Sequence, residues 1–362
     1  MQAEKPIKAY RFETKLERDD IVFYDVKDEP FEVYGLYNYK NEDSFIRLPD
    51  EVAAATSPSV HSLSKQSAGG RIRFSTDAPL IVVKAIFNRI VRHDHMPLTS
   101  SAGMDVYIDG EGGSIYYQTV RPGVDVKNEY TVVVNFGSQQ ERKLTINMPL
   151  FSEVAKVYIG MPESASVGRG LQYINKHPIV YYGSSITHGA CSSRPGLCYE
   201  NIISRRYNLD YVNLGFSGNA KGEDAICEYM ASMDMSVFVS DYDHNASVAG
   251  LKATHSRLYD TVRRKNPDIP YVMITRPDLI GKYDDAYDRR DIVLDTFRYA
   301  RSKGDKNVYF IDGEGFFRGP DADCCTVDGT HPNDLGFMKM ANSIGCVIER
   351  AVNSLIIGGK EI

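Results

Sequence analysis

An apolar run leads directly into a glycine and two serines in residues 178–187, Pro-Ile-Val-Tyr-Tyr-Gly-Ser-Ser-Ile-Thr. Short, near-continuous apolar runs are typical of strands buried on both faces of a parallel sheet. Similar runs lie at 211–214, 235–239, 271–274 and 308–311. Longer amphipathic segments, which we predict as helices, lie at 199–207, 222–231, 248–265, 287–303 and 333–352. This alternation predicts an α/β domain with helices on both faces of a parallel sheet.

The half of the chain before this stretch has a different pattern. Short segments rich in β-branched and aromatic residues lie at 71–75, 80–86, 104–108, 130–134, 143–147 and 154–159, and Gly, Pro, Asp and Asn clusters separate them. Many short strands at this spacing predict an antiparallel sandwich or jelly roll. We therefore expect an all-β domain over 1–165, a linker around 161–175, and the α/β domain over 176–362.

The overall composition and the N-terminal sequence bear on the binding partners and on the compartment. The 362 residues carry a formal net charge of −6 and are 43% hydrophobic, which gives no reason to expect nucleic acid or a membrane surface as a partner. The N-terminus lacks the apolar core of a signal peptide. The compartment stays open, and a periplasmic or secreted location is expected only if a leader has been removed. The six cysteines favour free thiols over a disulfide.

Two places far apart in the chain carry residues that suit serine-based acyl chemistry. Ser185 follows the first strand of the α/β domain, and Asp328 and His331 lie near the C-terminus. A serine hydroxyl becomes nucleophilic when an imidazole takes its proton, and a carboxylate holds that imidazole in the required tautomer. Each segment alone has a simpler interpretation, a helix-capping serine and an Asp-Gly turn. Together they favour a Ser-His-Asp triad.

Two loops after the next strands add hydrogen-bond donors. Gly218 follows the second strand, and Asn245 ends the segment Ser-Asp-Tyr-Asp-His-Asn after the third. A glycine N–H and an asparagine amide can both donate to an oxyanion, although an isolated glycine more often only satisfies a turn. Asp241, Asp243 and His244 have two further interpretations, a divalent metal site or a polar network that positions loops. We favour the network and expect no metal and no cofactor, because no second ligand cluster of matching type occurs.

Taken together, these segments resemble the SGNH, or GDSL-type, hydrolases. The resemblance implies a flavodoxin-like three-layer α/β/α sandwich. It implies that Ser185 is the nucleophile, that His331 is the base and that Asp328 orients it. It also implies an oxyanion hole built from Ser185, Gly218 and Asn245.

The layout resembles one two-domain branch of that family, which has a β-rich N-terminal module. The Gly-x-Asp-Leu-Tyr signature of this module is matched at 103–107, and its other runs are matched at 47–49 (Arg-Leu-Pro) and 70–74 (Gly-Arg-Ile-Arg-Phe). Two positions depart from the family pattern. Ser184 stands where an aspartate is usual, and Asp-Tyr-Asp-His-Asn replaces Gly-x-Asn-Asp, so Asn245 or His244 could reach the oxyanion. We favour Asn245, because only an amide donates at every pH.

The resemblance implies a serine esterase that removes small acyl groups, with acetyl as the first choice, from a carbohydrate or related polar ester. Acyl transfer by the same residues and glycan binding by an inactive hydrolase scaffold are the alternatives. Arg276, Arg194 and Asp243 are candidate substrate contacts or, equally, structural ion-pair partners. The expected partner is a small-molecule or carbohydrate ester, and the oligomeric state is left open.

Overall fold

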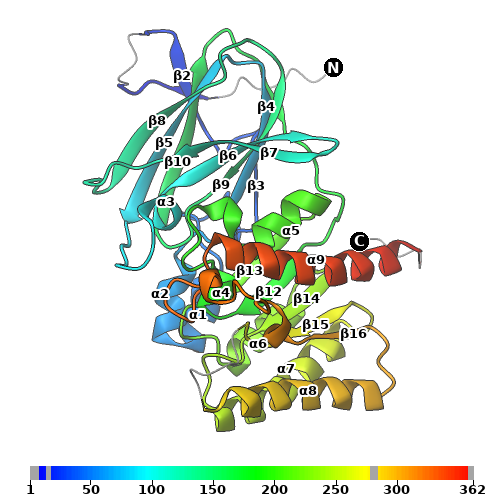
Figure 1. The fold of residues 1–362 in the computed structure, drawn as a ribbon. Coiled ribbons are helices and arrows are strands. Elements are labelled where there is room, and N and C mark those ends of the chain that lie inside the picture. Colours follow the sequence, from blue (N-terminus) through cyan, green and yellow to red (C-terminus); the bar gives the residue numbers. More distant parts are fainter. Residues whose placement is uncertain (1–7, 14–17, 278–283, 358–362) are drawn as a thin grey trace.

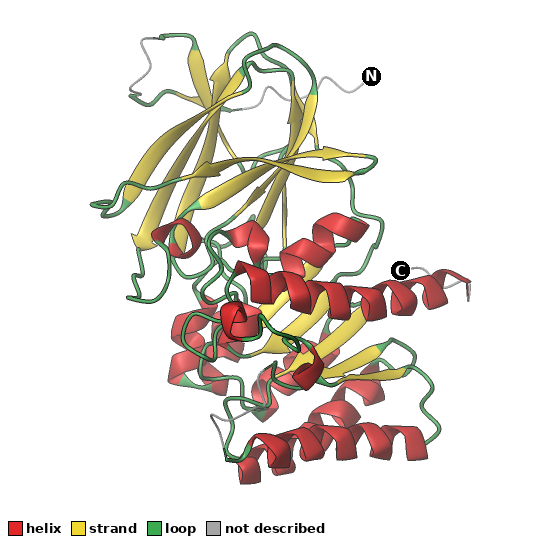
Figure 2. Cartoon of the chain, viewed as in Figure 1, coloured by secondary structure: helices red, strands yellow, loops and turns green. Residues whose placement is uncertain are grey.

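The computed structural model describes residues 8–13, 18–277 and 284–357. An antiparallel β sandwich forms one end of the molecule, and an α/β domain forms the other (Figures 1 and 2). One sheet of the sandwich has the strand order β1-β2-β10-β5-β8, and the other has β11-β4-β9-β6-β7, with β3 paired to β4. The strands are β1 (Ala9–Tyr10), β2 (Ile21–Asp25), β3 (Glu32–Tyr34), β4 (Arg71–Thr76), β5 (Leu80–Arg89), β6 (Met104–Gly110), β7 (Gly113–Val120), β8 (Glu129–Asn135), β9 (Arg142–Asn147), β10 (Glu153–Pro162) and β11 (Val167–Arg169).

The sandwich contains all six strands expected from the sequence, and it contains more. β1, β2, β3 and β7 were not predicted. The sequence of β7 shows no clear alternation of apolar and polar residues, because β7 is the edge strand of its sheet and much of it is exposed. β11 lies inside the expected linker and pairs with β4. The N-terminal sheet therefore continues to Arg169, beyond the predicted end of the domain.

The second domain has a five-stranded parallel sheet with the order β13-β12-β14-β15-β16. This is the order of flavodoxin-like folds, so the predicted fold is confirmed. Its strands are β12 (Ile179–Gly183), β13 (Tyr211–Gly215), β14 (Val237–Asp241), β15 (Tyr271–Ile274) and β16 (Val308–Ile311). Helices α5 (Tyr199–Tyr207) and α9 (Asp334–Ile357) cover one face. Helices α6 (Asp224–Ser232), α7 (Val248–Lys265) and α8 (Ala286–Ser302) cover the other (Figure 1).

The N-terminal half also contributes two helices to the α/β domain, which the sequence analysis missed. They are α1 (Asp50–Thr56) and α2 (Pro58–Ser64), and Ser57 caps α2 by accepting from the Val60 N–H. Ala53 and Val60 are fully buried in the same apolar core as Val180 of β12. The two domains therefore share a core. Among the described helices, none is long and apolar enough to cross a membrane.

The signature runs of the N-terminal module lie at the interface between the domains. Arg71 of the Gly-Arg-Ile-Arg-Phe run pairs with Asp210 and donates to the Tyr211 carbonyl at 2.9 Å. Asp105 of the Gly-x-Asp-Leu-Tyr run accepts from the Gly196 N–H at 2.9 Å. These buried charged contacts fix the orientation of the two domains.

Candidate active site

Ser185 begins the short helix α4 (Ser185–His188), directly after β12. Ser184 caps this helix, because its hydroxyl accepts from the Ile186 N–H at 3.2 Å. Gly183 permits the tight strand-to-helix turn, since a Cβ at this position would lie 2.0 Å from Thr187 Oγ1. Ser185 therefore lies at the carboxyl edge of the sheet, where ligands bind in folds of this type. Its N–H belongs to a first helical turn, whose N–H groups have no intrahelical acceptor.

The structure brings Ser185, His331 and Asp328 into one hydrogen-bonded chain. Ser185 Oγ lies 2.9 Å from His331 Nε2, and His331 Nδ1 lies 2.8 Å from Asp328 Oδ2. The other oxygen of Asp328 accepts from the N–H groups of Thr330 and His331 at 3.0 and 2.8 Å. Partial burial raises the pKa of Asp328, but these hydrogen bonds outweigh it and bring the pKa to about 2. The carboxylate is therefore ionised at neutral pH.

The three predicted oxyanion donors converge on the same cavity. Gly218 has a left-handed backbone with φ of 71°, and a Cβ there would meet no atom within 4 Å. Asn245 Oδ1 accepts from the Ala220 N–H at 3.2 Å, which leaves the NH₂ group of the amide as the donor. Ser185, Gly218 and Asn245 all line the cavity. Their roles in oxyanion binding stay predictions.

The acidic segment beside Asn245 forms a buried network. Asp243 Oδ1 lies 2.8 Å from His244 Nδ1, and Asp243 Oδ2 accepts from the Arg276 N–H at 3.1 Å. Burial raises the pKa of Asp243, but His244 and this N–H outweigh it and leave the pKa below its usual value. Burial and the nearby Asp243 raise the pKa of Asp241 well above its usual value. One ligand atom from each of Asp241, Asp243 and His244 lies within 4.8 Å of the others, which is close enough to hold a metal. The opposite directions of these two pKa shifts favour protonation of Asp241 before Asp243.

Of the three candidate substrate contacts, only one lines the cavity. Arg276 lines the cavity, so its predicted role remains a hypothesis. Arg194 fits its alternative interpretation, a structural ion-pair partner: its guanidinium pairs with Asp105 at 2.7 Å and lies 4.0 Å from the ring centre of Tyr116, so it joins the two domains. Asp243 also fits the alternative interpretation, because its side chain is buried in the network described above.

Much of the cavity wall comes from the N-terminal half of the chain. The cavity has a volume of about 780 Å³. Residues from α2 and the turn after it, from β5 and the loop after it, and from the loop before β10 form this wall: Ser59, Ser62, Leu63, Gln66, Arg89, Val91, His93, His95, Met96 and Phe151. The sequence analysis missed all of them. They belong to no motif, and only the fold brings them to the carboxyl edge of a sheet in the other domain.

A hydrogen-bonded serine, histidine and aspartate at the edge of a parallel sheet are typical of serine ester hydrolases. Comparison with known sequences agrees. A family model described as the GDSL-like Lipase/Acylhydrolase family matches residues 176–349, and one described as the N-terminus of Esterase_SGNH_hydro-type matches 21–167. The chain belongs to this GDSL-like family of carboxylic ester hydrolases, in the branch with the N-terminal module. A search of curated proteins found no match.

Solved structures with both domains resemble this chain along nearly its whole length. A protein from Bacteroides ovatus ATCC 8483, described as GDSL-like, is 29% identical, with a TM-score of 0.83 over 92% of this chain and 98% of that one. A salicylyl-acyltransferase from a tetracycline biosynthetic pathway is 20% identical, with a TM-score of 0.75 over 93% and 98%. A family two carbohydrate esterase from Clostridium thermocellum is 14% identical, with a TM-score of 0.63 over 90% and 99%. The last two support the fold alone.

Proposed function

We propose that this protein is a serine esterase that removes small acyl groups, acetyl first among them, from a carbohydrate or a related polar ester. The observation that carries the proposal is the chain of contacts from Ser185 through His331 to Asp328, with distances of 2.9 and 2.8 Å, at the wall of the cavity. The reaction requires no metal or cofactor.

In the proposed mechanism, Ser185 Oγ attacks the ester carbonyl while His331 Nε2 accepts the hydroxyl proton. Asp328 holds Nδ1 protonated and stabilises the imidazolium that forms. The N–H groups of Ser185 and Gly218 and the amide of Asn245 would stabilise the oxyanion. His331 then protonates the departing alcohol. A water molecule, deprotonated by the same imidazole, cleaves the acyl-enzyme.

The cavity supports a polar alcohol as the larger part of the substrate. Its volume of about 780 Å³ is many times that of an acetyl group and lies within the range of small-molecule sites. Its lining combines polar side chains, including Ser62, Gln66 and Asn219, with apolar ones such as Phe151. Such a surface suits the hydroxyl groups and the apolar faces of a sugar better than it suits a long acyl chain.

The Ser185→Ala variant tests the proposal. We expect it to lose turnover of p-nitrophenyl acetate and of acetylated sugars by more than about 10⁴-fold, with an unchanged melting temperature. The exposed Ser302 on α8 gives the control, Ser302→Ala, which should keep full activity. Unchanged turnover by Ser185→Ala would contradict the assignment of the nucleophile.

Three assays separate the alternatives. Product analysis with and without alcohol acceptors distinguishes hydrolysis from acyl transfer, because a transferase yields a new ester instead of free acid. Labelling of Ser185 by a fluorophosphonate probe excludes an inactive glycan-binding scaffold. Loss of turnover on chelation would instead favour a metal hydrolase built on Asp241, Asp243 and His244.

A further inference from the structure

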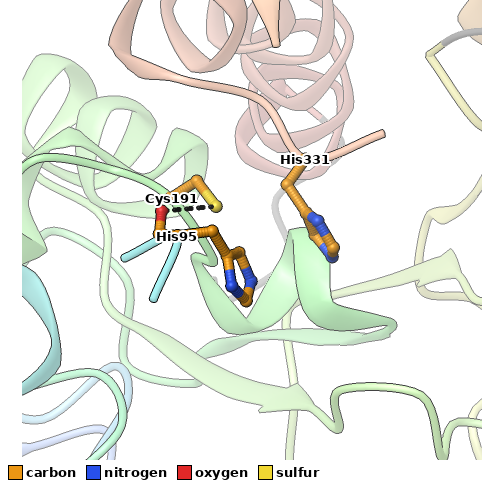
Figure 3. A group of neighbouring side chains, drawn as sticks. All are labelled: His95, Cys191 and His331. Atoms are coloured by element: carbon orange, nitrogen blue, oxygen red, sulfur yellow. Dashed lines mark hydrogen bonds between the residues drawn. The ribbon is translucent and has the colours of Figure 1, made fainter. Parts of the chain in front are cut away.

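Three side chains from distant parts of the sequence lie close together (Figure 3), and two of them, His95 and His331, line the cavity. His95 lies on the loop between β5 and helix α3 (Leu98–Ser101), Cys191 follows α4, and His331 precedes α9. One ligand atom from each, a ring nitrogen or the sulfur, lies within 4.8 Å of the other two. The ring centres of His95 and His331 are 5.5 Å apart. We call these three residues the His–Cys–His cluster.

The surrounding contacts hold the members of this cluster toward one another. Cys191 Sγ donates to the His95 carbonyl at 3.5 Å, so the thiol lies against the loop that carries His95. Asp94 Oδ1 lies 3.0 Å from His95 Nδ1, which leaves Nε2 of that ring for a ligand. A carboxylate on the distal nitrogen is the usual support of a metal-binding histidine.

A second contact ties the cysteine loop to the histidine segment. The N–H and hydroxyl of Ser193, two residues after Cys191, donate to the two oxygens of Asp334 at 2.8 and 2.6 Å. Asp334 follows His331 by three residues. Cys191 and His331 are therefore anchored to each other by the backbone segments that carry them, while His95 comes from the N-terminal module.

Two imidazoles and one thiolate match the ligand preference of zinc. Zn²⁺ binds histidine nitrogen and cysteine sulfur in tetrahedral sites, and three protein ligands leave one position for water. Ligand atoms of such a site lie about 3.3–3.6 Å apart, so side-chain rotations that shorten the longest separation by about 1 Å would complete it. We propose that His95, Cys191 and His331 bind Zn²⁺ and that the bound ion blocks the esterase site.

Binding would disable His331 whichever nitrogen it uses. Nε2 faces Ser185 and Nδ1 faces Asp328, so a metal on either atom breaks the hydrogen-bonded chain. Burial raises the pKa of the Cys191 thiol to about 12, so coordination displaces its proton to solvent as the Zn–S bond forms. Metal binding depends only on the cluster, whereas the loss of activity rests on the proposed esterase function.

Metal binding is tested first, on the full-length Ser185→Ala variant, which lacks the proposed nucleophile, so that binding is measured independently of esterase activity. Ser185→Ala keeps all three ligands, and Co²⁺ serves as the spectroscopic probe for zinc. We expect one equivalent of Co²⁺ to give a thiolate-to-cobalt charge-transfer band, and one equivalent of Zn²⁺ to abolish it. Adding Cys191→Ser should remove the band and weaken zinc binding by more than about 10-fold. The exposed Cys346 on α9 supplies the control, since Cys346→Ser should leave both unchanged.

Inhibition is then measured on the active protein. Zn²⁺ should abolish ester turnover, and a chelator should restore it. The Cys191→Ser variant should be far less sensitive to zinc. At the Zn²⁺ concentration that abolishes turnover by the unmodified protein, its turnover should stay within about twofold of the rate that the same variant shows without metal. His95→Gln should weaken zinc binding, measured by titration, without removing the thiolate band. The proposal is overturned if Ser185→Ala shows no stoichiometric band, or if Cys346→Ser and not Cys191→Ser removes it. If the protein shows no esterase activity, the cobalt and zinc titrations still test metal binding by the His–Cys–His cluster.

Discussion

Arg47 donates a 2.6 Å hydrogen bond to the carbonyl oxygen of Gly215, three residues before the predicted oxyanion donor Gly218. The same guanidinium donates to the carbonyls of Leu63 and Gln66, at 2.7 and 2.9 Å, at the end of α2. It lies 4.7 Å from the ring centre of Phe216. Burial lowers the pKa of Arg47 to about 9, because it is removed from water among neutral carbonyls. One side chain of the N-terminal half thus fixes the loop that carries Gly218.

Arg47→Met should therefore destabilise the whole protein. It leaves several buried carbonyls without a donor, and we expect the free energy of unfolding to fall by about 3 kcal/mol or more. Arg47→Lys should lose less, because an ammonium group can still donate to up to three of the carbonyls. Chemical denaturation measures both. Arg298→Ala on α8, where the side chain is 66% exposed, is the control and should change stability by no more than about 0.5 kcal/mol. An equally small effect of Arg47→Met would show that the contacts to the carbonyls contribute little.

Asp328→Asn should reduce kcat while leaving the fold intact. The Asn oxygen can still accept from the N–H groups of Thr330 and His331, and its NH₂ group then faces His331 Nδ1. Nδ1 would become an acceptor, so the proton would move to Nε2, which could no longer accept from Ser185. We expect kcat to fall by about 10²–10⁴-fold with little change in KM, measured by steady-state kinetics.

Asp321, an exposed carboxylate on the preceding turn, provides the matched control. Asp321→Asn removes the same charge from the same surface and should keep its activity within about twofold. Equal losses from both variants would assign the effect of Asp328 to general surface charge and not to the imidazole.

The parallel sheet was predictable because its strands are buried on both faces. Val180 and Tyr182 face one apolar core, and Ile179 and Tyr181 face the other, so β12 reads as one continuous apolar run. The edge strand β7 lacked this signal, since Tyr116 and Ile115 are exposed. Helices α1 and α2 were missed for a different reason. Each has only seven residues, and their stability comes from packing on the other domain, which local sequence does not encode.

Sequence alone indicated site residues only where a short segment carried side chains typical of serine-based catalysis. Ser185, Asp328 and His331 lie in short polar segments at strand or helix ends, and the structure brings them together. The role of Arg194 stayed open in the sequence analysis because its partners, Asp105 and Tyr107, lie about 90 residues earlier in the chain. A sequence without coordinates cannot distinguish an arginine in an interface from one in a cavity. The same long-range packing brings His95 next to His331.

Asn245 and His244 both line the cavity, and a pair of variants decides which one contacts the oxyanion. Asn245→Ala removes the amide that the Ala220 N–H orients. It should lower kcat by about 10²–10³-fold with a small effect on KM. His244→Gln should have a much smaller effect on kcat. Steady-state kinetics on p-nitrophenyl acetate measure both, and the reverse order of effects would move the oxyanion role to His244.

His255 on α7 should make the protein less stable in acid. Its ring is fully buried, with Nδ1 2.9 Å from Thr296 Oγ1 and Nε2 3.4 Å from Ser240 Oγ. Burial lowers its pKa to about 4, against about 6.5 in the unfolded chain. Between these values the unfolded state binds a proton that the native state does not, so stability falls as the pH drops from about 6.5 to about 4. The difference contributes about 3 kcal/mol in total.

The His255→Gln variant isolates this contribution. Glutamine can keep hydrogen bonds to Thr296 and Ser240 but does not titrate, so the loss of unfolding free energy between about pH 7.5 and pH 4.5 should shrink by about 2–3 kcal/mol. Urea denaturation at both pH values measures this change in the free energy of unfolding. Ser302→Ala, at an exposed and non-titrating position on α8, is the control and should leave the pH dependence unchanged. His188 is also buried, with its pKa held well below the usual value by burial and by the nearby Arg47, so part of the acid sensitivity should persist in His255→Gln. An identical pH dependence in His255→Gln and the unmodified protein would mean that His255 is already charged in the native state.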